Sequence, residues 1–217
     1  APGPELSAAG PATTEVEPYC YLPIDVHALR GEFPSLPAVI ADDRISFDSY
    51  SDRKLFVHNM GHAICAYLGR LHGDREIWQA IGRPALRALV RGAMIESACA
   101  LAEHYGQPVG PLLGHVDDLI HRFANRALGA TVARVGADPR RKLAAGDRLL
   151  GAYQQCLAQG IDPRHLRVGL AAGLHQLATE ESLDAGAVEA FLEAQGITDP
   201  DERALVQEYR SVLATGF

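Results

Sequence analysis

The sequence predicts an all-α, multi-helical domain with a short extended segment near its N-terminus. From about Phe47 onward, hydrophobic residues recur at helical spacing, with glycine or proline at the breaks between periodic segments. The 217 residues are 47% hydrophobic and 22% charged, which suits a globular protein with a sizeable core. No glycine-rich loop follows a predicted strand, so we expect no Rossmann domain in this chain.

The N-terminal part differs in composition from the rest. Residues 1–14 are rich in Pro, Gly, Ala and Ser, which predicts a linker or a disordered segment. Aromatic and aliphatic residues between Pro18 and Pro23 favour a short extended segment, and residues 25–29 suggest one helical turn. We assign residues 15–217 to one helical domain. Because the first residue is Ala rather than Met, we expect this chain to be a piece of a longer one.

Eight helices are predicted after the extended segment. Gly73 and Gly106 mark the ends of two of them, because glycine readily adopts the left-handed conformation found there. Pro84, Pro163 and Pro200 mark starts, because the first helical turn does not need the N–H that proline lacks. The predicted ranges are 49–72, 74–81, 84–106, 109–127, 147–159, 162–178, 184–195 and 200–214.

The overall charge and the cysteines restrict the possible partners and compartments. With a formal net charge of −7 and a pI near 5.7, the chain has no global positive field to attract nucleic acid or an anionic membrane. No run approaches the roughly 20 apolar residues of a membrane span, and no signal sequence is recognisable. The four cysteines lack any CxxC spacing, which predicts a cytoplasmic protein. The oligomeric state stays open.

The most informative segment runs from Lys54 to His62. At about 100° per residue, Lys54, Asn59 and His62 share one arc of a helix that continues through the apolar residues 63–69. Interconversion of an alcohol and a ketone needs a group that exchanges the hydroxyl proton and donors that steady the oxyanion. A lysine in a partly apolar pocket suits the first task, and an asparagine and a histidine suit the second. On spacing alone, a solvated helix face with one core histidine is the alternative.

The segment Lys54-Leu55-Phe56-x-x-Asn59-x-Gly61-His62-Ala63 resembles the signature of the long-chain mannitol dehydrogenase family. Other stretches are similar, in order, to those of mannitol-1-phosphate 5-dehydrogenases, which are the most similar members. These stretches are Gly92-Ala93-Met94, Glu96-Ser97, Arg122-Phe123 with Asn125, Arg134-Val135-Gly136, Arg141-Lys142-Leu143 and Gly146-Asp147-Arg148-Leu149. The resemblance covers roughly residues 16–213 and matches the family's helical C-terminal substrate domain.

The resemblance implies an NAD-dependent polyol dehydrogenase that interconverts mannitol 1-phosphate and fructose 6-phosphate, with a polyol or sugar phosphate as its partner. Lys54 would be the general acid/base, and Asn59 and His62 would orient the reacting oxygen. Arg134 and Lys142 match positions expected to contact substrate hydroxyls or an anionic end. NAD would be bound mainly by a domain absent from this chain, so we expect this chain alone to be inactive. No metal is expected.

A basic cluster and one altered segment bear on the substrate. Arg140, Arg141, Lys142 and Arg148 form the clearest local concentration of positive charge, which suits a phosphate monoester; a solvated turn is the alternative. Residues 126–131 depart from the family pattern, which usually has a proline after the asparagine and an acidic residue near the middle. The departure leaves the identity of the polyol, and retained activity, open.

Several alternatives remain at the level of sequence. His58 and His62 are four residues apart and can present two nitrogens to one metal ion, with Glu96 or His104 as conceivable further ligands. Glu96 can otherwise pair with His62 or Lys54, or form a simple salt bridge elsewhere. Trp78 is interpreted as a packing aromatic. For the domain as a whole, the alternatives are a non-catalytic sugar-phosphate-binding or oligomerising domain, or part of a dehydrogenase for free mannitol or a sugar acid.

Overall fold

The structure, a computed structural model, describes residues 22–30, 39–40 and 45–215. The linker predicted over residues 1–14 lies outside this part of the chain. The chain divides into two compact units, residues 1–47 and 48–217.

The described residues of the first unit form a small extended structure. Strand β1 (Leu22–Pro23) pairs in parallel with β2 (Val39–Ile40), with Leu22 opposite Val39. The Oδ1 atom of Asp25 accepts hydrogen bonds from the N–H groups of His27 and Ala28, which makes residues 26–28 a turn. Strand β1 falls at the end of the short extended segment predicted near the N-terminus, and the earlier part of that segment lies outside the described residues.

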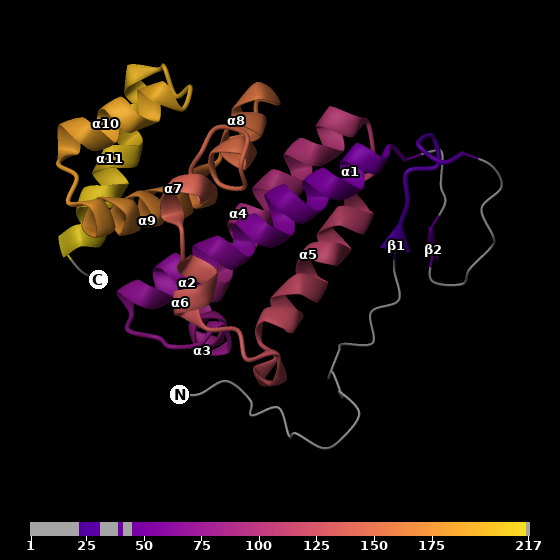
Figure 1. The fold of residues 1–217 in the computed structure, drawn as a ribbon, viewed down its shortest axis with the longest axis horizontal. Helices are drawn as coiled ribbons and strands as arrows, with labels where there is room; N and C mark the ends of the chain where they lie inside the picture. The colour runs from indigo at the N-terminus through magenta and orange to yellow at the C-terminus, as the bar shows by residue number, and fades with distance from the viewer. Residues whose placement is uncertain (1–21, 31–38, 41–44, 216–217) are drawn as a thin grey trace. The chain divides into compact units, whose positions relative to one another are not determined.

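The second unit is helical, which confirms the predicted all-α class (Figure 1). The helical elements are α1 (Phe47–Asp52), η1 (Arg53–Asn59), α2 (Met60–Leu71), α3 (Ile77–Gly82), α4 (Pro84–Tyr105), α5 (Val109–Phe123), η2 (Arg126–Leu128), α6 (Val132–Gly136), α7 (Pro139–Lys142), α8 (Leu150–Ala158), α9 (Arg164–Glu181), α10 (Ala185–Ala194) and α11 (Pro200–Thr215). The first three of them, α1, η1 and α2, form one unbroken helical run. None of the described helices is both long and apolar enough to cross a bilayer.

Helix α2 lies at the centre of the core and packs against α3, α4, α6 and α9. Ile64, Cys65 and Ala66 are completely buried, and burying a side chain such as Ile64 stabilises the fold by about 1.5–3 kcal/mol. Two glycines allow close approach of the neighbouring helices. A Cβ at Gly61 would lie 2.5 Å from the sulfur of Met94 on α4, and one at Gly169 on α9 would lie 2.3 Å from Cδ1 of Ile64.

The segment between α5 and α6 is tied back to the start of α3. Glu76 and Thr131 form an isolated antiparallel bridge. Beside it, the N–H of Ile77 donates to the carbonyl oxygen of Ala130, and the N–H of Val132 donates to that of Arg75, each at 2.9 Å. These bonds hold the chain after α5 next to α3, and the two together form one side of the cavity described below.

Two short helices, α6 and α7, were not among the predicted ones. Both depend on their first residues rather than on hydrophobic period. The Thr131 hydroxyl accepts a hydrogen bond from the N–H of Arg134 and so caps α6. Asp138 precedes α7 in the left-handed conformation, with φ 58°, and Pro139 fills the first helical position. Helices of four or five residues are too short to show a periodic pattern.

Candidate active site

The residues predicted to be catalytic begin in a π-helical stretch. Lys54, His58 and Asn59 belong to η1, where hydrogen bonds run from residue i to i+5 rather than i+4. Residues five apart are stacked in such a helix, so Lys54 and Asn59 lie closer to one face than the roughly 140° separation of an α-helix would place them. Such stretches are rare, and they occur frequently at functional sites.

A contact from α4 accompanies this irregular stretch. The hydroxyl of Ser97 donates a hydrogen bond to the carbonyl oxygen of Phe56, inside η1, at 2.8 Å. A side chain that binds a helix carbonyl from outside is a recognised cause of local helix distortion. Lys54 itself is exposed to solvent, whereas Asn59 and His62 are half-buried.

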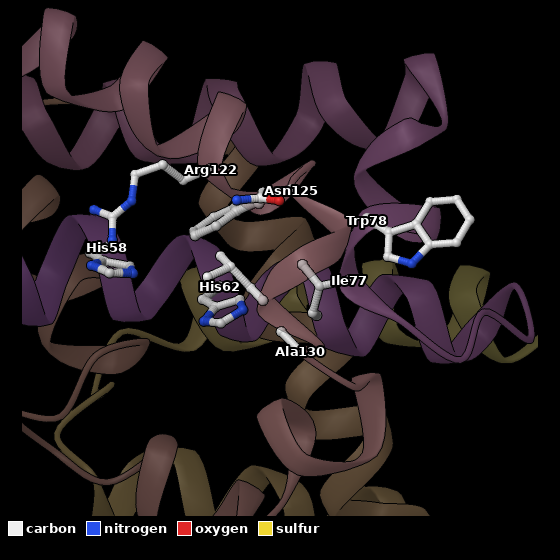
Figure 2. Close-up of a pocket in the computed structure, with 9 residues that line it drawn as sticks. His58, His62, Ile77, Trp78, Arg122, Asn125 and Ala130 are labelled. Atoms are coloured by element: carbon white, nitrogen blue, oxygen red, sulfur yellow. The ribbon is translucent and has the colours of Figure 1, made fainter. Parts of the chain in front are cut away.

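A cavity of about 50 Å³, room for a few water molecules, opens beside α2. Its walls come from η1 and α2, from the start of α3, and from the end of α5 with the segment that follows. Figure 2 shows His58 at one end of this lining, the indole ring of Trp78 at the other, and His62 between them. The lining residues are His58, His62, Ile77, Trp78, Arg122, Phe123, Asn125, Leu128 and Ala130.

His62 is the best-defined polar group of the cavity. Its ring stacks on Phe123, with centroids 4.7 Å apart and planes at 15°, and the His58 ring lies 6.1 Å from it. The pKa of His62 is lowered from 6.5 to about 4, mainly by burial and then by the nearby His58, Arg134, Lys142 and Arg148. The imidazole is therefore neutral at pH 7, with one nitrogen as donor and the other as acceptor.

The electrostatic surroundings of this cavity are positive. Besides His58, the cations Arg134, Lys142 and Arg148 lower the pKa of His62. The same holds for His115 on α5, whose pKa is lowered to about 4 by burial and then by Arg53, His58 and Arg122. In a chain with a net charge of −7, this region favours a ligand that carries or develops negative charge.

The two predicted substrate residues differ in their exposure. Arg134 on α6 is exposed, whereas Lys142 at the end of α7 is only 5% exposed. The Nζ of Lys142 donates to the carbonyl oxygens of Val135, at 2.7 Å, and Ala137. Its pKa is lowered, first by burial and then by nearby arginines. The structure thus brings Arg134, Lys142 and His62 into one electrostatic neighbourhood.

The arginines of the basic cluster are matched by carboxylates. Arg140 forms a two-pronged pair with Glu181, and Arg148 pairs with Asp147 at 2.9 Å. The third arginine, Arg141, contacts Asp138 and also Asp147. Much of the positive charge expected from the sequence is therefore compensated within the fold.

Glu96 does not pair with His62 or Lys54. Its carboxylate accepts hydrogen bonds from the N–H groups of His165 and Leu166, at 2.9 to 3.1 Å, and contacts the His165 ring. It therefore caps the N-terminus of α9 from a different helix. Across the part of the chain that is described, no three His, Cys, Asp or Glu side chains form a group that could hold a metal ion.

The cavity also contains residues that were not predicted to be functional. Trp78, interpreted as a packing aromatic, lines the cavity, and Phe123 forms the stacking partner of His62. Arg122 and Asn125 lie beside Phe123 in the lining. The family resemblance of the stretch Arg122-Phe123-x-Asn125 indicated this part of the cavity lining, whereas hydrophobic periodicity and residue spacing did not.

Comparison with known proteins identifies a family and a similar fold. A family model described as the mannitol dehydrogenase C-terminal domain matches residues 46–198. The fold is similar to that of Pseudomonas fluorescens mannitol 2-dehydrogenase, solved as a ternary complex with NAD and D-mannitol, with a TM-score of 0.62 and 19% sequence identity. The likeness covers 82% of this chain but only 39% of that chain, so this chain spans well under half of that enzyme's length. At this identity, the structural likeness establishes the shared fold.

Proposed function

Because the chain belongs to the mannitol dehydrogenase family, as its C-terminal domain, we propose that it is the substrate-binding and catalytic domain of an NAD-dependent polyol dehydrogenase. The observation that carries this proposal is the neutral His62 imidazole beside the cations Arg134, Lys142 and Arg148, on the same helical run as Lys54 and Asn59. The D-mannitol and NAD in the structurally similar enzyme add support. The specific reaction that we propose is the interconversion of mannitol 1-phosphate and fructose 6-phosphate.

In this mechanism, the reacting hydroxyl oxygen lies against His62 and Asn59. As the alcohol becomes a ketone, the uncharged amine of Lys54 accepts the hydroxyl proton; in the reverse direction its ammonium form returns that proton to the oxygen. The N–H of the neutral imidazole and the amide of Asn59 donate to the oxygen while negative charge develops on it. NAD, when bound, supplies the hydride acceptor.

Arg134 and Lys142 are proposed to position the rest of the substrate. The ammonium group of Lys142 has three hydrogens, two of which donate to backbone carbonyls. The third hydrogen suits a substrate hydroxyl, and the backbone bonds fix its direction. The described residues include only the two-residue strands β1 and β2 and form no dinucleotide-binding sheet. We therefore propose that NAD is held mainly by a part of the protein outside these 217 residues.

A dehydrogenase for free mannitol is the second candidate. Carboxylates compensate Arg140, Arg141 and Arg148, so these arginines offer a phosphate ester less than their number suggests. In this case the same Lys54, Asn59 and His62 act on an uncharged polyol.

The test is NADH oxidation by the complete protein, offered fructose 6-phosphate and fructose side by side. Replacing Lys54 by Ala is expected to lower kcat by about 10²–10⁴-fold, because the proton then lacks its acceptor and donor. Lys54 is exposed, so the free energy of unfolding should change by less than about 0.5 kcal/mol. Arg70→Ala, at an exposed position on α2, is the matched control.

The outcomes separate the candidates. Turnover of the phosphate ester alone supports the mannitol 1-phosphate reaction, and turnover of fructose alone supports a free-polyol enzyme. A near-normal rate in Lys54→Ala would remove Lys54 from the mechanism. Turnover of neither substrate would contradict the proposal and favour a non-catalytic sugar-phosphate-binding or oligomerising domain.

A further inference from the structure

The segment that departs from the family pattern, residues 126–131, supplies part of the cavity wall. Leu128 and Ala130 line the cavity directly. The backbone here is held at three points. The Asn125 side chain accepts a hydrogen bond from the N–H of Ala127 at 3.0 Å, Gly129 adopts the left-handed conformation with φ 55°, and the bridge from Thr131 to Glu76 closes the segment onto α3.

This arrangement stacks Arg126 on Trp78. The guanidinium carbon lies 4.0 Å from the centroid of the indole ring, within the range of a cation–π contact. The indole is itself fixed, because its Nε1–H donates to Oε2 of Glu76 at 2.6 Å. A stacked arginine uses only one face of its planar group, so the N–H groups at its edge still point outward and can bind a carboxylate or phosphate.

Trp78 separates the cavity from an open outer groove. The indole lines both of them, and Arg126 and Arg83 both line the groove. The two arginines differ in their partners. Arg83 forms a bidentate pair with Asp74, with both bonds at 2.8 Å, whereas no carboxylate pairs with Arg126 among the described residues. Arg126 is therefore the cation of this groove whose charge the fold does not compensate.

We propose that Arg126, held on the face of Trp78, binds the anionic end of the substrate and selects a charged sugar over a neutral one. This assignment rests on the proposed function: the reacting carbon lies at His62 inside the cavity, and the chain of the substrate passes Trp78 to reach the groove. The cavity of about 50 Å³ holds only part of such a molecule, so the far end must extend outside. Arg126 is a specificity residue, because it contacts the far end of the substrate and not the reacting atoms. A phosphate ester and a carboxylate share the chemistry that it recognises.

The test measures binding by isothermal titration calorimetry to this chain, its Arg126→Ala and Arg126→Lys variants, and Arg83→Ala as the matched control. The probes are fructose 6-phosphate, fructose, and a ketohexose that carries a terminal carboxylate. Trp78 is the single tryptophan of the chain, so a change in its emission on titration reports that a ligand lies at this position. Thermal melts check that each variant is folded.

Arg126→Ala is expected to weaken binding of the preferred anionic sugar by about 10- to 100-fold. Arg126→Lys should keep part of that affinity, because the charge remains but the fork geometry is lost. Arg83→Ala should change it less than about threefold. The wild-type preference between the two anionic probes identifies the end group as phosphate or carboxylate.

Equal losses in Arg126→Ala and Arg83→Ala, or an equal loss for fructose and the anionic sugars, would overturn the assignment. So would an absence of binding of both anionic probes by the wild-type chain. These results are distinguishable from failure of the proposed function. If the protein shows no turnover but its anion binding depends on Arg126, the dehydrogenase proposal fails and the assignment of Arg126 stands. If the protein shows turnover but its anion binding does not depend on Arg126, the assignment of Arg126 fails and the dehydrogenase proposal stands.

Discussion

Two groups of basic side chains in this protein look alike in the sequence and differ in their surroundings, although Lys142 and Arg148 belong to both. Around His62, the cations Arg134, Lys142 and Arg148 lower the pKa of the imidazole. In the cluster at residues 140–148, each arginine contacts a carboxylate. The difference teaches that the number of basic residues in a stretch does not locate an anion site. What matters is whether the fold has already supplied the opposite charge.

The two groups also differ in how their charges are held. In the region of His62, Lys142 is anchored by uncharged carbonyl oxygens, and at the rim of the cavity Arg126 is anchored by an aromatic face. Anchors of this kind fix a cation without neutralising it. Carboxylate anchors, as for Arg140, fix it and remove most of its field. Arg148 lies at the border, because it pairs with Asp147 and still acts on His62.

The largest effect that separates the two regions is expected from His62→Ala. Loss of one donor to a developing oxyanion should lower kcat by about 10²–10³-fold. The matched control is His115→Ala, since burial also lowers the pKa of His115 to about 4 but His115 does not line the cavity. Steady-state kinetics of the complete protein measure both variants. A similar loss in the two would mean that His62 acts through the fold and not through the reacting oxygen.

The next effect concerns stability and compares two neighbours in sequence. Lys142→Met removes a buried amine and leaves the carbonyls of Val135 and Ala137 without their donor, at a cost of about 1–3 kcal/mol. Arg141→Met breaks ion pairs in which the arginine is about half exposed, which should cost less than about 1 kcal/mol. Urea unfolding curves give both values. If the arginine variant proved as destabilised as the lysine variant, the distinction between carbonyl and carboxylate anchoring would fail.

Much of the fold could be predicted from hydrophobic period and from glycine and proline. The long helices were predicted in this way, because each has enough turns to repeat its hydrophobic pattern and a glycine or proline at its end. The π-helical form of residues 53–59 was not predicted. It coincides with a contact from Ser97, about forty residues away, which the local sequence does not indicate. Helix α6 depends on the hydroxyl of Thr131, which is a local contact that a periodic pattern does not report.

The site divides in the same way. The motif that contains Lys54, Asn59 and His62 is local, so sequence could nominate it. The stacking of His62 on Phe123 and of Arg126 on Trp78 joins elements about 50 to 60 residues apart, and nothing in either segment alone indicates the partner. The compensation of Arg140 by Glu181 is equally non-local, at a separation of 41 residues. Contacts of this kind follow from the fold and not from the motif.

The smallest effect that we predict is a difference in pH dependence between the two regions. His62 and His115 have pKa values of about 4 in the folded protein, against 6.5 for a histidine side chain in the unfolded chain. Between these values the unfolded chain binds more protons than the folded one, so stability is present above pH 6.5 and is lost as the pH falls toward 4. In the arginine cluster, the hydrogen bonds from Arg141 and Arg140 lower the pKa values of Asp138 and Glu181 below 3.8 and 4.5, so that region should lose stability only at lower pH.

At pH 5, each of the two histidines should cost on the order of 1 kcal/mol after allowance for solvent screening. Free energies of unfolding at pH 7, 6 and 5 for the wild type and His115→Gln test this, because the variant should lose about half as much between pH 7 and 5. Arg141→Met serves as the control from the other region, and its curve should run parallel to that of the wild type over this range. If His115→Gln also ran parallel, His115 would not be held neutral by the fold. Because His58 acts on the pKa of both histidines, such a result would also weaken the positive field assigned to the cavity.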